Sequence, residues 1–390
     1  MEISHRLATI LGDGSDGWTI FYKARQLKDD GVDVVELTVG QHDIPTDPMI
    51  LEAMYNAAMA GHVGYTEMPG LPALRDKVAE RVQASTGVPT TRDNVLMTAG
   101  GQAALFSANM ITLNPGDKGL FIDPYYATYP GTIRAASGIP VAVKAHAEDG
   151  FQPRASEIAA YAEGAKSLQI NSPNNPTGVV YSQKTMDDLA QVCIDKDLWM
   201  ISDEVYDTQI WEGEHITPRA LPDMLERTLV IGSLSKSHAM TGSRIGWLVG
   251  PEPVIEQLQH LIINTTYGLP GFIQRGALHA LNAGPEFEAK IAEPFRRRRD
   301  LAQKVVDKSN VVTSIPAQGA MYMMLDIRAT GMSGDDFAEA LLDEHHIAVM
   351  PGETFGQAAE GHLRVALTVD DDRLVTSLET LIAFAERRSK

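Results

Sequence analysis

The chain contains almost no cysteine and no long apolar segment. Cys193 is the one cysteine among 390 residues, which rules out a disulfide framework and a metal site made of cysteine ligands, and no metal site is predicted. Cys193 follows Leu189 and Val192 in an amphipathic pattern, so it is expected to fill space in the core. No apolar run approaches a membrane span, and the first residues lack the basic-then-apolar pattern of a signal peptide. We therefore expect a cytoplasmic protein that does not enter a membrane.

Positive charge is also scarce. Lysine and arginine together number 33, against 51 aspartate and glutamate residues, so the formal net charge is −18. Nucleic acids and anionic membrane surfaces bind clustered positive charge, so neither is an expected partner. The one basic run, Arg296 to Arg299, lies in a helical pattern among acidic residues. We expect it to form a solvated helix face with ion pairs.

What the chain does have is an ordinary globular composition, with 44% hydrophobic and 22% charged residues, and enough length for two domains. From about residue 94 to 250, short apolar runs alternate with helical patterns such as 101–112 and 183–196. This alternation predicts an α/β fold with a mostly parallel seven-stranded sheet covered by helices, whose sites lie at the carboxyl ends of the strands. The expected strands are 94–98, 119–123, 140–144, 167–171, 198–203, 228–232 and 245–249.

The pattern changes after residue 250. A helical region is expected first, interrupted by one glycine and two prolines: 271–307, with Gly284, Pro285 and Pro294. The expected elements of the compact α+β tail that follows are strands near 319–327, 347–350 and 362–368 and helices at 333–345 and 371–387. The segment before residue 45, including a strand from Val34 to Val39, is expected to pack with this tail. The sequence therefore predicts a large domain at 46–285 and a small α+β domain formed by 1–45 and 286–390.

A lysine among small hydroxyl residues follows one of the expected strands. Residues 233–244 read Ser-Leu-Ser-Lys-Ser-His-Ala-Met-Thr-Gly-Ser-Arg, directly after the apolar run 228–231. An amine such as that of Lys236 can form an imine with an aldehyde, while hydroxyl groups and the guanidinium of Arg244 can hold a phosphate. A phosphorylated aldehyde that needs a lysine is pyridoxal 5'-phosphate (PLP). By itself, however, such a loop is more often a solvated turn.

Three further strand ends carry polar residues that suit such a cofactor. Asp203 is either a turn or N-cap residue or a carboxylate that keeps a pyridine nitrogen protonated. Asn175, in Asn-Ser-Pro-Asn-Asn-Pro-Thr-Gly, belongs to a turn or donates a hydrogen bond to a phenolate oxygen. The glycines of Ala-Gly-Gly-Gln, residues 99–102, form a tight turn or expose backbone N–H groups to a phosphate.

With these residues the chain resembles the fold type I PLP-dependent enzymes, and within them the class I, aspartate aminotransferase-like aminotransferases. The resemblance extends from Gly40 to Arg364. Its motifs are specific because several intervals agree together. The matching intervals are 28 residues from Asn175 to Asp203, three from Asp203 to Tyr206 and eight from Lys236 to Arg244. The resemblance implies a transaminase that moves an α-amino group from an amino acid to a 2-oxo acid by a ping-pong mechanism.

The resemblance also implies a role for each matching residue around the cofactor. Lys236 would bond the cofactor aldehyde and, once displaced by the substrate, carry the α-proton. Asp203 would pair with the pyridine nitrogen, and Asn175 and Tyr206 would bond the phenolic oxygen. Tyr126 would stack on the ring. The residues implied to hold the phosphate are Gly101 and Gln102 through their backbone N–H groups, Ser233, Ser235 and Arg244.

Substrate and subunit contacts follow from the same resemblance. Arg364 would clamp the substrate α-carboxylate with its bidentate fork, and the backbone of Gly40 would contact the same group, with Asn175 beside them. Tyr65 matches a tyrosine that reaches the phosphate of the neighbouring subunit. A homodimer with shared active sites is therefore implied, and its substrates would be an amino acid and a 2-oxo acid.

Side-chain specificity depends on Gln102 and Trp18. Gln102 stands where one subgroup of aspartate aminotransferases has a lysine for the side-chain carboxylate, and a neutral amide would lose about 1.5–3 kcal/mol there. Trp18 either lies over the substrate side chain, on a guanidinium or an apolar group, or anchors the N-terminus on the core. The stretches similar to an arginine:pyruvate transaminase are 12–18, 197–206, 233–242 and 267–274. We expect a neutral or basic amino-acid donor and a small 2-oxo acid acceptor.

Three alternatives stay open at this point. One is an aspartate aminotransferase that acts with 2-oxoglutarate. Another is a PLP-dependent carbon–sulfur β-lyase on the same fold, because the same chemistry can expel a β-substituent. The third is a non-catalytic regulator, but such a protein needs a DNA-binding domain, and the sequence shows neither an N-terminal extension nor a basic helix that would serve as one.

Overall fold

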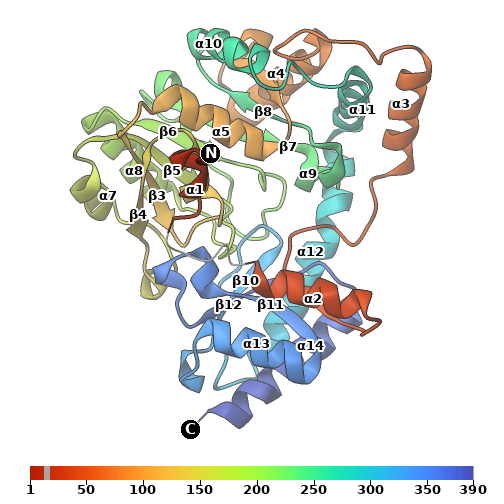
Figure 1. Ribbon diagram of the computed structural model, residues 1–390, viewed down its shortest axis with the longest axis vertical. Coiled ribbons are helices and arrows are strands. Elements are labelled where there is room, and N and C mark those ends of the chain that lie inside the picture. Colours follow the sequence, from red (N-terminus) through yellow and green to blue (C-terminus); the bar gives the residue numbers. More distant parts are fainter. Residues whose placement is uncertain (13–17, 390) are drawn as a thin grey trace.

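The computed structural model describes residues 1–12 and 18–389 of the protein. The largest sheet among these residues has the strand order β2-β8-β7-β6-β5-β3-β4. In Figure 1 its labelled strands lie above β10 (Tyr322–Asp326), β11 (Ile347–Pro351) and β12 (His362–Ala366). Its strands are β2 (Val95–Thr98), β3 (Lys118–Asp123), β4 (Ile139–Lys144), β5 (Ala165–Asn171), β6 (Trp199–Asp203), β7 (Thr228–Ser233) and β8 (Gly246–Val249). β8 pairs antiparallel with both of its neighbours, and the other pairings are parallel. The predicted seven-stranded, mostly parallel sheet is therefore confirmed.

Helices cover both faces of this central sheet. Successive strand residues are correspondingly buried on opposite sides. Leu229 and Ile231 of β7 pack into one apolar cluster, whereas Val230 between them packs into another. Such continuous burial is typical of parallel strands with cover on both faces. The covering helices are α4 (Pro72–Thr86), α5 (Gly101–Thr112), α6 (Tyr129–Ala135), α7 (Ala155–Tyr161), α8 (Gln183–Asp195), α10 (Glu252–Ile263) and α11 (Gly271–Asn282).

A second sheet joins the two ends of the chain, with the strand order β1-β11-β12-β10-β9. β1 pairs in parallel with β11, so that Val35 lies opposite Ile347. The predicted packing of the N-terminal strand with the tail is thereby confirmed. The elements of this unit are β1 (Val35–Leu37), β9 (Thr313–Ile315), β10 (Tyr322–Asp326), β11 (Ile347–Pro351) and β12 (His362–Ala366), with α2 (Thr19–Asp29), α13 (Gly334–His345) and α14 (Asp371–Arg388). The sequence pattern does not predict β9, which is only three residues long.

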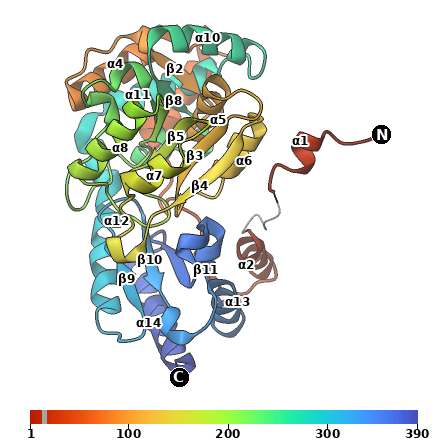
Figure 2. The same ribbon diagram turned by 90° about the vertical axis from the view of Figure 1, so that its left-hand side faces the viewer.

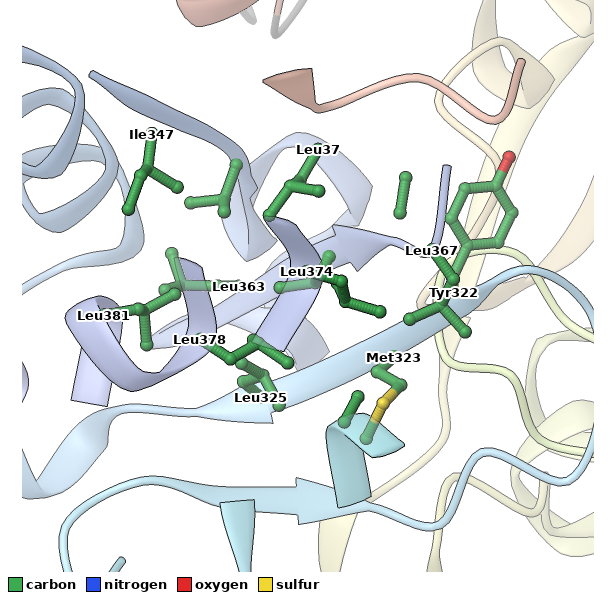
Figure 3. Close-up of a cluster of buried hydrophobic side chains, with 14 of the residues drawn as sticks. Leu37, Tyr322, Met323, Leu325, Ile347, Leu363, Leu367, Leu374, Leu378 and Leu381 are labelled. Carbon is green, nitrogen blue, oxygen red and sulfur yellow. The ribbon is translucent and has the colours of Figure 1, made fainter. Parts of the chain in front are cut away.

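Leucines from strands and from α14 form the core of this second unit (Figure 3). Leu37 and Leu363 come from two strands and are fully buried. Leu374, Leu378 and Leu381 of α14 lie on one helix face, because they are four and three residues apart, and this face covers the strands. Full burial of one such side chain contributes about 1.5–3 kcal/mol. Apolar burial therefore fixes the sheet that brings β10 and β12 to the central unit.

The helices after residue 270 depart from the prediction at one point. α11 ends at Asn282 and α12 (Gly284–Val306) begins at Gly284, where the predicted break is found. Pro294, however, lies inside α12 and does not interrupt it. A proline in a helix costs about 3 kcal/mol, but Ile291 and Phe295 beside it are buried. Their burial offsets this cost, since each contributes about 1.5–3 kcal/mol.

The basic run of α12 is only partly the solvated face that the sequence predicts. Arg297 is exposed and pairs with Glu293 and Asp371. Arg298 is buried and forms a two-pronged pair with Asp43 at 3.0 and 2.6 Å. The expected ion pairs are present, but α12 packs against the segment that follows β1, and this packing removes one arginine from solvent.

The N-terminal residues stand to one side of the main body (Figure 2). The short helix α1 (His5–Ala8) has no buried residue. Arg134 of α6 donates a hydrogen bond from Nη1 to the backbone oxygen of Ile10 at 3.2 Å. The segment that follows α1 is therefore bound to α6 of the central unit by a polar contact.

Cys193 is fully buried in an apolar cluster with α8, as predicted, and burial raises the pKa of its thiol to about 12. No helix within the described ranges is long and apolar enough to cross a membrane.

Candidate active site

Side chains from both sheets meet around one cavity of about 290 Å³. Asn171, Asp203 and Ser233 line it and are the last residues of β5, β6 and β7, so the cavity lies at the carboxyl ends of the parallel strands. The second sheet contributes Tyr322 from β10 and Arg364 from β12. The predicted site residues that line this cavity are Trp18, Gly40, Gly101, Gln102, Tyr126, Asn175, Asp203, Tyr206, Ser233, Ser235, Lys236, Arg244 and Arg364.

Lys236 lies in the short helix α9 (Leu234–Ser237), which directly continues β7. Its Nζ donates a hydrogen bond to the backbone oxygen of Gly40. Burial lowers the pKa of the Lys236 amine, and the charges of Arg364 and Arg244 act in the same direction. A lowered pKa increases the fraction of neutral amine at neutral pH, and only the neutral amine acts as a nucleophile or a base.

Asp203 is a buried carboxyl group that receives few hydrogen bonds. Tyr129 Oη donates to Asp203 Oδ2 at 2.7 Å, and the backbone N–H of Val205 approaches Oδ1 at 3.4 Å. Burial raises the pKa of Asp203 to about 6, although both hydrogen bonds favour the ionised form. A cationic group beside Asp203 would restore the ionised form by charge attraction. The site therefore offers a buried acceptor for a protonated ring nitrogen.

Arg364 reaches from β12 across the cavity to Asn175. Its Nη1 donates to Asn175 Oδ1 at 2.9 Å, and its Nη2 donates to the backbone oxygen of Thr38. Because a guanidinium only donates, the amide oxygen of Asn175 must face it. The amide NH₂ of Asn175 is thereby directed to the other side, where it can donate to a second oxygen.

The Arg364 guanidinium is a buried cation that lies among rings. It lies 4.5 Å from the ring centre of Tyr322 and 4.3 Å from that of Phe355. Burial lowers the pKa of Arg364. The groups that oppose this effect are tyrosine hydroxyls, and no acidic side chain of the described residues is among them. Its Nε is buried without a hydrogen-bond partner among those residues. A buried cation with an unused donor is unfavourable by itself and is suited to a carboxylate ligand.

Another part of the cavity combines a helix N-terminus with two serines and an arginine. α5 begins at Gly101, and its first N–H groups have no acceptor within the helix. A Cβ atom on Gly100 would lie 2.6 Å from Nη2 of Arg244, so this guanidinium lies close to the backbone and a side chain at position 100 would displace it. Ser233 Oγ at the end of β7 and Ser235 Oγ in α9 lie 3.0 Å apart. Such a set of donors fits a phosphate.

Gln102 is held by a neighbouring hydroxyl group. Thr128 Oγ1 donates to Gln102 Oε1 at 3.0 Å, which leaves the amide NH₂ as the group that Gln102 offers to a ligand. The cationic side chains among the described residues that line the cavity are Lys236, Arg244 and Arg364. Gln102 itself therefore offers a neutral amide, and no positive charge, to a carboxylate on a ligand side chain.

The sequence left two alternatives open for Trp18, a contact with the substrate and an anchor for the N-terminus, and its position is compatible with both. It lines the cavity, and it packs edge-on against Phe21 of α2 with the ring centres 5.3 Å apart. A role in substrate binding stays a prediction. Of the stretch 12–18 that resembles an arginine:pyruvate transaminase, residues 13–17 lie outside the described residues.

Tyr65 is the predicted site residue that does not line the cavity. Its side chain is 86% exposed, and its ring packs edge-on against Tyr267 with centres 5.0 Å apart. Its predicted role in a neighbouring subunit stays a prediction.

Sequence reasoning missed two tyrosines that the fold brings into the site. Tyr129 is the first residue of α6, and its backbone N–H donates to the backbone oxygen of Tyr126 at 2.9 Å. The three-residue spacing of the two tyrosines is a signal that could have pointed to Tyr129. Tyr322 lies in the buried strand β10, where the sequence reads as ordinary core, so no local signal marks it. Gln41, next to Gly40, also lines the cavity and was not predicted.

The cavity is rich in hydrogen-bond donors, which suits anions and not metal ions. Within residues 1–12 and 18–389, no group of three or more histidine, cysteine, aspartate or glutamate side chains is arranged to hold a metal ion.

Comparisons with known proteins cover nearly the whole chain. A family model described as Aminotransferase class I and II matches residues 32–381. The arginine–pyruvate transaminase AruH of Pseudomonas aeruginosa is 40% identical over 376 residues, which are 96% of this chain and 95% of that protein. The aspartate/prephenate aminotransferase of Thermus thermophilus is 35% identical over 362 residues, which are 92% of each chain.

Solved structures give the same result for the fold. The structure of a double mutant of Thermus thermophilus aspartate aminotransferase has a TM-score of 0.92 and 32% identity to this chain, and the match covers 98% of this chain and 100% of that one.

Proposed function

Because the chain belongs to the class I and II aminotransferase family, we propose that it transfers the α-amino group of a neutral or basic amino acid to a small 2-oxo acid, with PLP, in the cavity around Lys236. One observation carries this proposal. A buried amine at Lys236, a buried carboxyl group at Asp203 and a buried guanidinium at Arg364 line a single cavity. Burial shifts each of the three pKa values in the direction that favours the neutral form of the group. A site that binds charged ligands explains why such groups are kept together.

The donors and acceptors of the cavity fit the polar groups of PLP. The start of α5, Ser233, Ser235 and Arg244 would hold the phosphate, and Asp203 would pair with the ring nitrogen. The amide NH₂ of Asn175 and the hydroxyl of Tyr206 would donate to the phenolic oxygen, while Tyr126 would contact the ring. When bound, PLP supplies an electron sink that makes the α-proton of the amino acid acidic.

Lys236 is the residue that would hold and move this proton. Burial and two neighbouring arginines lower its pKa, which raises the fraction of neutral amine that can accept a proton and return it later. The backbone oxygen of Gly40 accepts a hydrogen bond from Nζ and fixes its position. Two half-reactions at one lysine would give ping-pong kinetics, which initial rates with both substrates varied would show as parallel double-reciprocal lines.

Arg364 would bind the α-carboxylate of both substrates. Its Nε lacks a partner in the described chain, and a carboxylate would supply both an acceptor and the missing negative charge. Contacts with Asn175 and Thr38 hold the guanidinium in place before a substrate arrives. Orientation of the α-carbon relative to Lys236 follows from this fixed position.

The proposed donor class rests on Gln102 and on the relatives. Gln102 offers a neutral amide where a side-chain carboxylate would need a cation, and this disfavours aspartate. The relative that shares 40% of the residues is named an arginine–pyruvate transaminase. Aspartate is the alternative donor, since other relatives are named aspartate aminotransferases.

Absorption spectra test the role of Lys236. The purified protein is expected to show the visible band of bound PLP and transaminase activity. Lys236→Ala should lose that band and lower kcat by about 10²–10⁴-fold, the usual contribution of a positioned proton-transfer group. Lys196→Ala, which removes an exposed lysine, is the matched control and should change neither. A Lys236→Ala protein with the spectrum and rate of the parent protein would contradict the proposal.

A substrate screen tests the donor class. With pyruvate or 2-oxoglutarate as acceptor, kcat/KM for arginine and for neutral amino acids should exceed that for aspartate. Gln102→Lys should raise kcat/KM for aspartate by about 10–100-fold, since it adds a charge-assisted hydrogen bond, while Gln102→Met should not. Clear preference of the unmodified enzyme for aspartate refutes the proposed donor. Release of pyruvate and ammonia from cystathionine without an acceptor would favour the β-lyase alternative.

We also propose a homodimer, on the basis of an uncovered apolar face of α3 (Pro48–Met59). Leu51, Tyr55 and Met59 lie four residues apart on one side of this helix and are 48%, 64% and 71% exposed. Val63 and Tyr65 extend the exposed apolar surface beyond the helix. Contiguous apolar surface of this kind is typical of protein interfaces, and Tyr65 would then reach the cavity of the second copy.

The division into a large domain at 46–285 and a small domain of 1–45 and 286–390 also stays a proposal. Its second boundary lies at the first turn of α12, which runs from the central unit to the second sheet. Limited proteolysis of the cofactor-free protein would test whether cleavage concentrates at these boundaries.

A further inference from the structure

Tyr322 is a cavity residue to which the proposed function gives no role. It lies on β10 and is 2% exposed. Its ring stands at the edge of the leucine core, and its hydroxyl points away from the leucines toward the chain that follows β1 (Figure 3). An ordinary core position would not need this hydroxyl, since burial of an oxygen costs free energy unless it has a hydrogen-bond partner.

The Tyr322 hydroxyl has such a partner in Tyr206. The two Oη atoms lie 3.0 Å apart. The backbone of Gly40 lies on another side of the same hydroxyl, and a Cβ atom on Gly40 would stand 1.8 Å from Tyr322 Oη. The hydroxyl therefore occupies space that only a glycine at position 40 leaves open.

The Tyr322 ring has a second neighbour in Arg364. The guanidinium carbon lies 4.5 Å from the ring centre, within the range of a cation–π contact. Such a contact is stronger where water is excluded, and both side chains are buried here. One residue thus touches both the group proposed to bond the phenolic oxygen of PLP and the group proposed to bind the substrate carboxylate.

We infer that Tyr322 is a positioning residue with two separable actions, its hydroxyl on Tyr206 and its ring on Arg364. The inference rests on the proposed function, because Tyr206 and Arg364 must meet PLP and the substrate carboxylate. A hydroxyl group has one proton to donate. If Tyr206 donates its proton to the phenolic oxygen, then Tyr322 must be the donor in the pair of tyrosines. The hydrogen bonds run in one direction, from Tyr322 to Tyr206 to the ligand, and each bond strengthens the next.

Removal of the hydroxyl alone tests the first action. Tyr322→Phe keeps the ring over Arg364, so KM for the amino acid should stay within about twofold of the parent value. Tyr206 should become a weaker donor, the phenolic anion should be less stable, and the visible band of the PLP-loaded enzyme should titrate at higher pH. The expected rise of the midpoint is about 0.5 pH unit, since a hydrogen bond contributes about 0.5–1.5 kcal/mol and one pH unit equals about 1.4 kcal/mol.

Removal of the ring tests the second action. Tyr322→Leu should show the same rise of the midpoint and, in addition, an increase on the order of tenfold in KM for the amino acid. The dissociation constant of a carboxylate without an amino group, such as propionate, should rise by a similar factor. Phe355→Leu removes the other ring near Arg364; it should raise KM and the dissociation constant without shifting the midpoint. This variant and Tyr322→Phe keep the inference testable if Tyr322→Leu does not fold.

The control is Tyr125→Phe, which removes the hydroxyl of a half-buried tyrosine that does not line the cavity. It should leave the midpoint, KM and the dissociation constant unchanged. An unchanged midpoint in Tyr322→Phe overturns the action on Tyr206, and an unchanged KM in Tyr322→Leu overturns the action on Arg364. Both results require a parent enzyme that binds PLP and transaminates. A parent enzyme without the visible band instead refutes the proposed function.

Discussion

Single residues of the cavity are held in an electrostatically unfavourable state. Burial raises the pKa of Asp203 to about 6 and lowers the pKa values of Lys236 and Arg364. Each shift means that the charged form of the group is less stable in the folded protein than in water. Groups of this kind are favourable only when ligands of opposite charge arrive, so the cofactor-free protein is expected to gain stability when one of them is neutralised.

Asp203 gives the sharpest test of this idea. Its pKa is higher in the folded protein than its ordinary value, so the folded protein binds the proton more tightly. The destabilisation of the folded protein by ionised Asp203 is therefore complete above pH about 6. It disappears as the pH falls toward the ordinary aspartate pKa of 3.8. At about 1.4 kcal/mol per pH unit, the difference corresponds to about 3 kcal/mol. Cofactor-free Asp203→Asn should melt at a higher temperature than the parent protein at pH 8, and at nearly the same temperature at pH 4.

Asp326→Asn is the matched control for this prediction. Hydrogen bonds from Arg328 outweigh the opposing effect of burial and hold the pKa of Asp326 below its ordinary value, so its ionised form stabilises the folded protein. This variant should therefore melt at a lower temperature than the parent at pH 8. A lower melting temperature for Asp203→Asn at pH 8 would show that its hydrogen bonds matter more than its burial.

Sequence reasoning reached most of these residues because their types and spacings are chemically distinctive. A lysine after a strand, an aspartate at a strand end and an arginine beside serines can be recognised without a structure. Tyr322 could not be recognised, because its role comes from the place of β10 beside β12, where Met324 lies opposite Arg364. Its neighbours Gly40, Tyr206 and Arg364 are far from it in the sequence.

Arg298 of α12 pairs with Asp43 in the segment that follows β1, and also with Asp371 at the start of α14. Arg298 holds Asp43 with two hydrogen bonds, and Asp43 lies two residues beyond Gln41, which lines the cavity. Burial alone would raise the pKa of Asp43, but the hydrogen bonds and charge of Arg298 outweigh it and lower this pKa. The pair therefore stabilises the protein above the ordinary pKa of an aspartate, and this stabilisation is lost as the pH falls through the lowered value.

Asp43→Asn should weaken this connection. At pH 7 the variant is expected to lose about 1–3 kcal/mol, because Arg298 keeps its charge and loses a charged partner. At a pH below this lowered pKa the difference should be smaller, since the Asp43 carboxyl of the parent protein is then protonated. KM for the amino acid should also rise, because Gly40 and Gln41 are held less firmly. Melting temperatures at the two pH values and steady-state kinetics measure these effects.

Glu293→Gln serves as the control on the same helix. Glu293 pairs with exposed Arg297, and exposed ion pairs contribute only about 0–1 kcal/mol. This variant should leave melting temperature and KM nearly unchanged. Equal losses in the two variants would show that the Asp43 pair has no special role.

At the scale of elements, the sequence predicts what local periodicity controls. The strands of the central sheet and helices such as α5 and α13 were predicted within a few residues. Pro294 was predicted to interrupt a helix that in fact continues, because apolar packing of α12 outweighs a local preference. Arg298 was expected in solvent but is buried, because a helical pattern does not reveal which neighbour will cover a given face of the helix.

At the scale of the whole molecule, the proposed sharing of sites between two copies makes a prediction about mixtures. Lys236→Ala leaves Tyr65 intact, and Tyr65→Ala leaves Lys236 intact. If Tyr65 serves the cavity of its partner, a mixed dimer contains one cavity with both residues and should recover up to about half of the activity of one parent dimer. If both residues serve the same cavity, no mixed dimer contains an intact one.

The experiment requires exchange of subunits between the two variants. They should be unfolded together, refolded with PLP and compared with each variant refolded alone. Light scattering would give the mass of the assembly, and Met59→Glu, which places a charge on the exposed face of α3, should shift it toward the monomer. Activity of the mixture equal to the mean of the separate variants would refute the sharing of sites.

The sequence by itself determined the α/β class, the joining of the two chain ends and the chemical identity of most cavity residues. These properties follow from local patterns, from the types of reactive side chains and from intervals along one chain. Only the tertiary structure decided that Lys236 meets Gly40, that Arg364 lies between Asn175 and aromatic rings, and that Tyr322 joins Tyr206. The physical reason is that most of these contacts connect residues that lie on or beside two different sheets, and packing between sheets is not encoded in any one stretch of sequence.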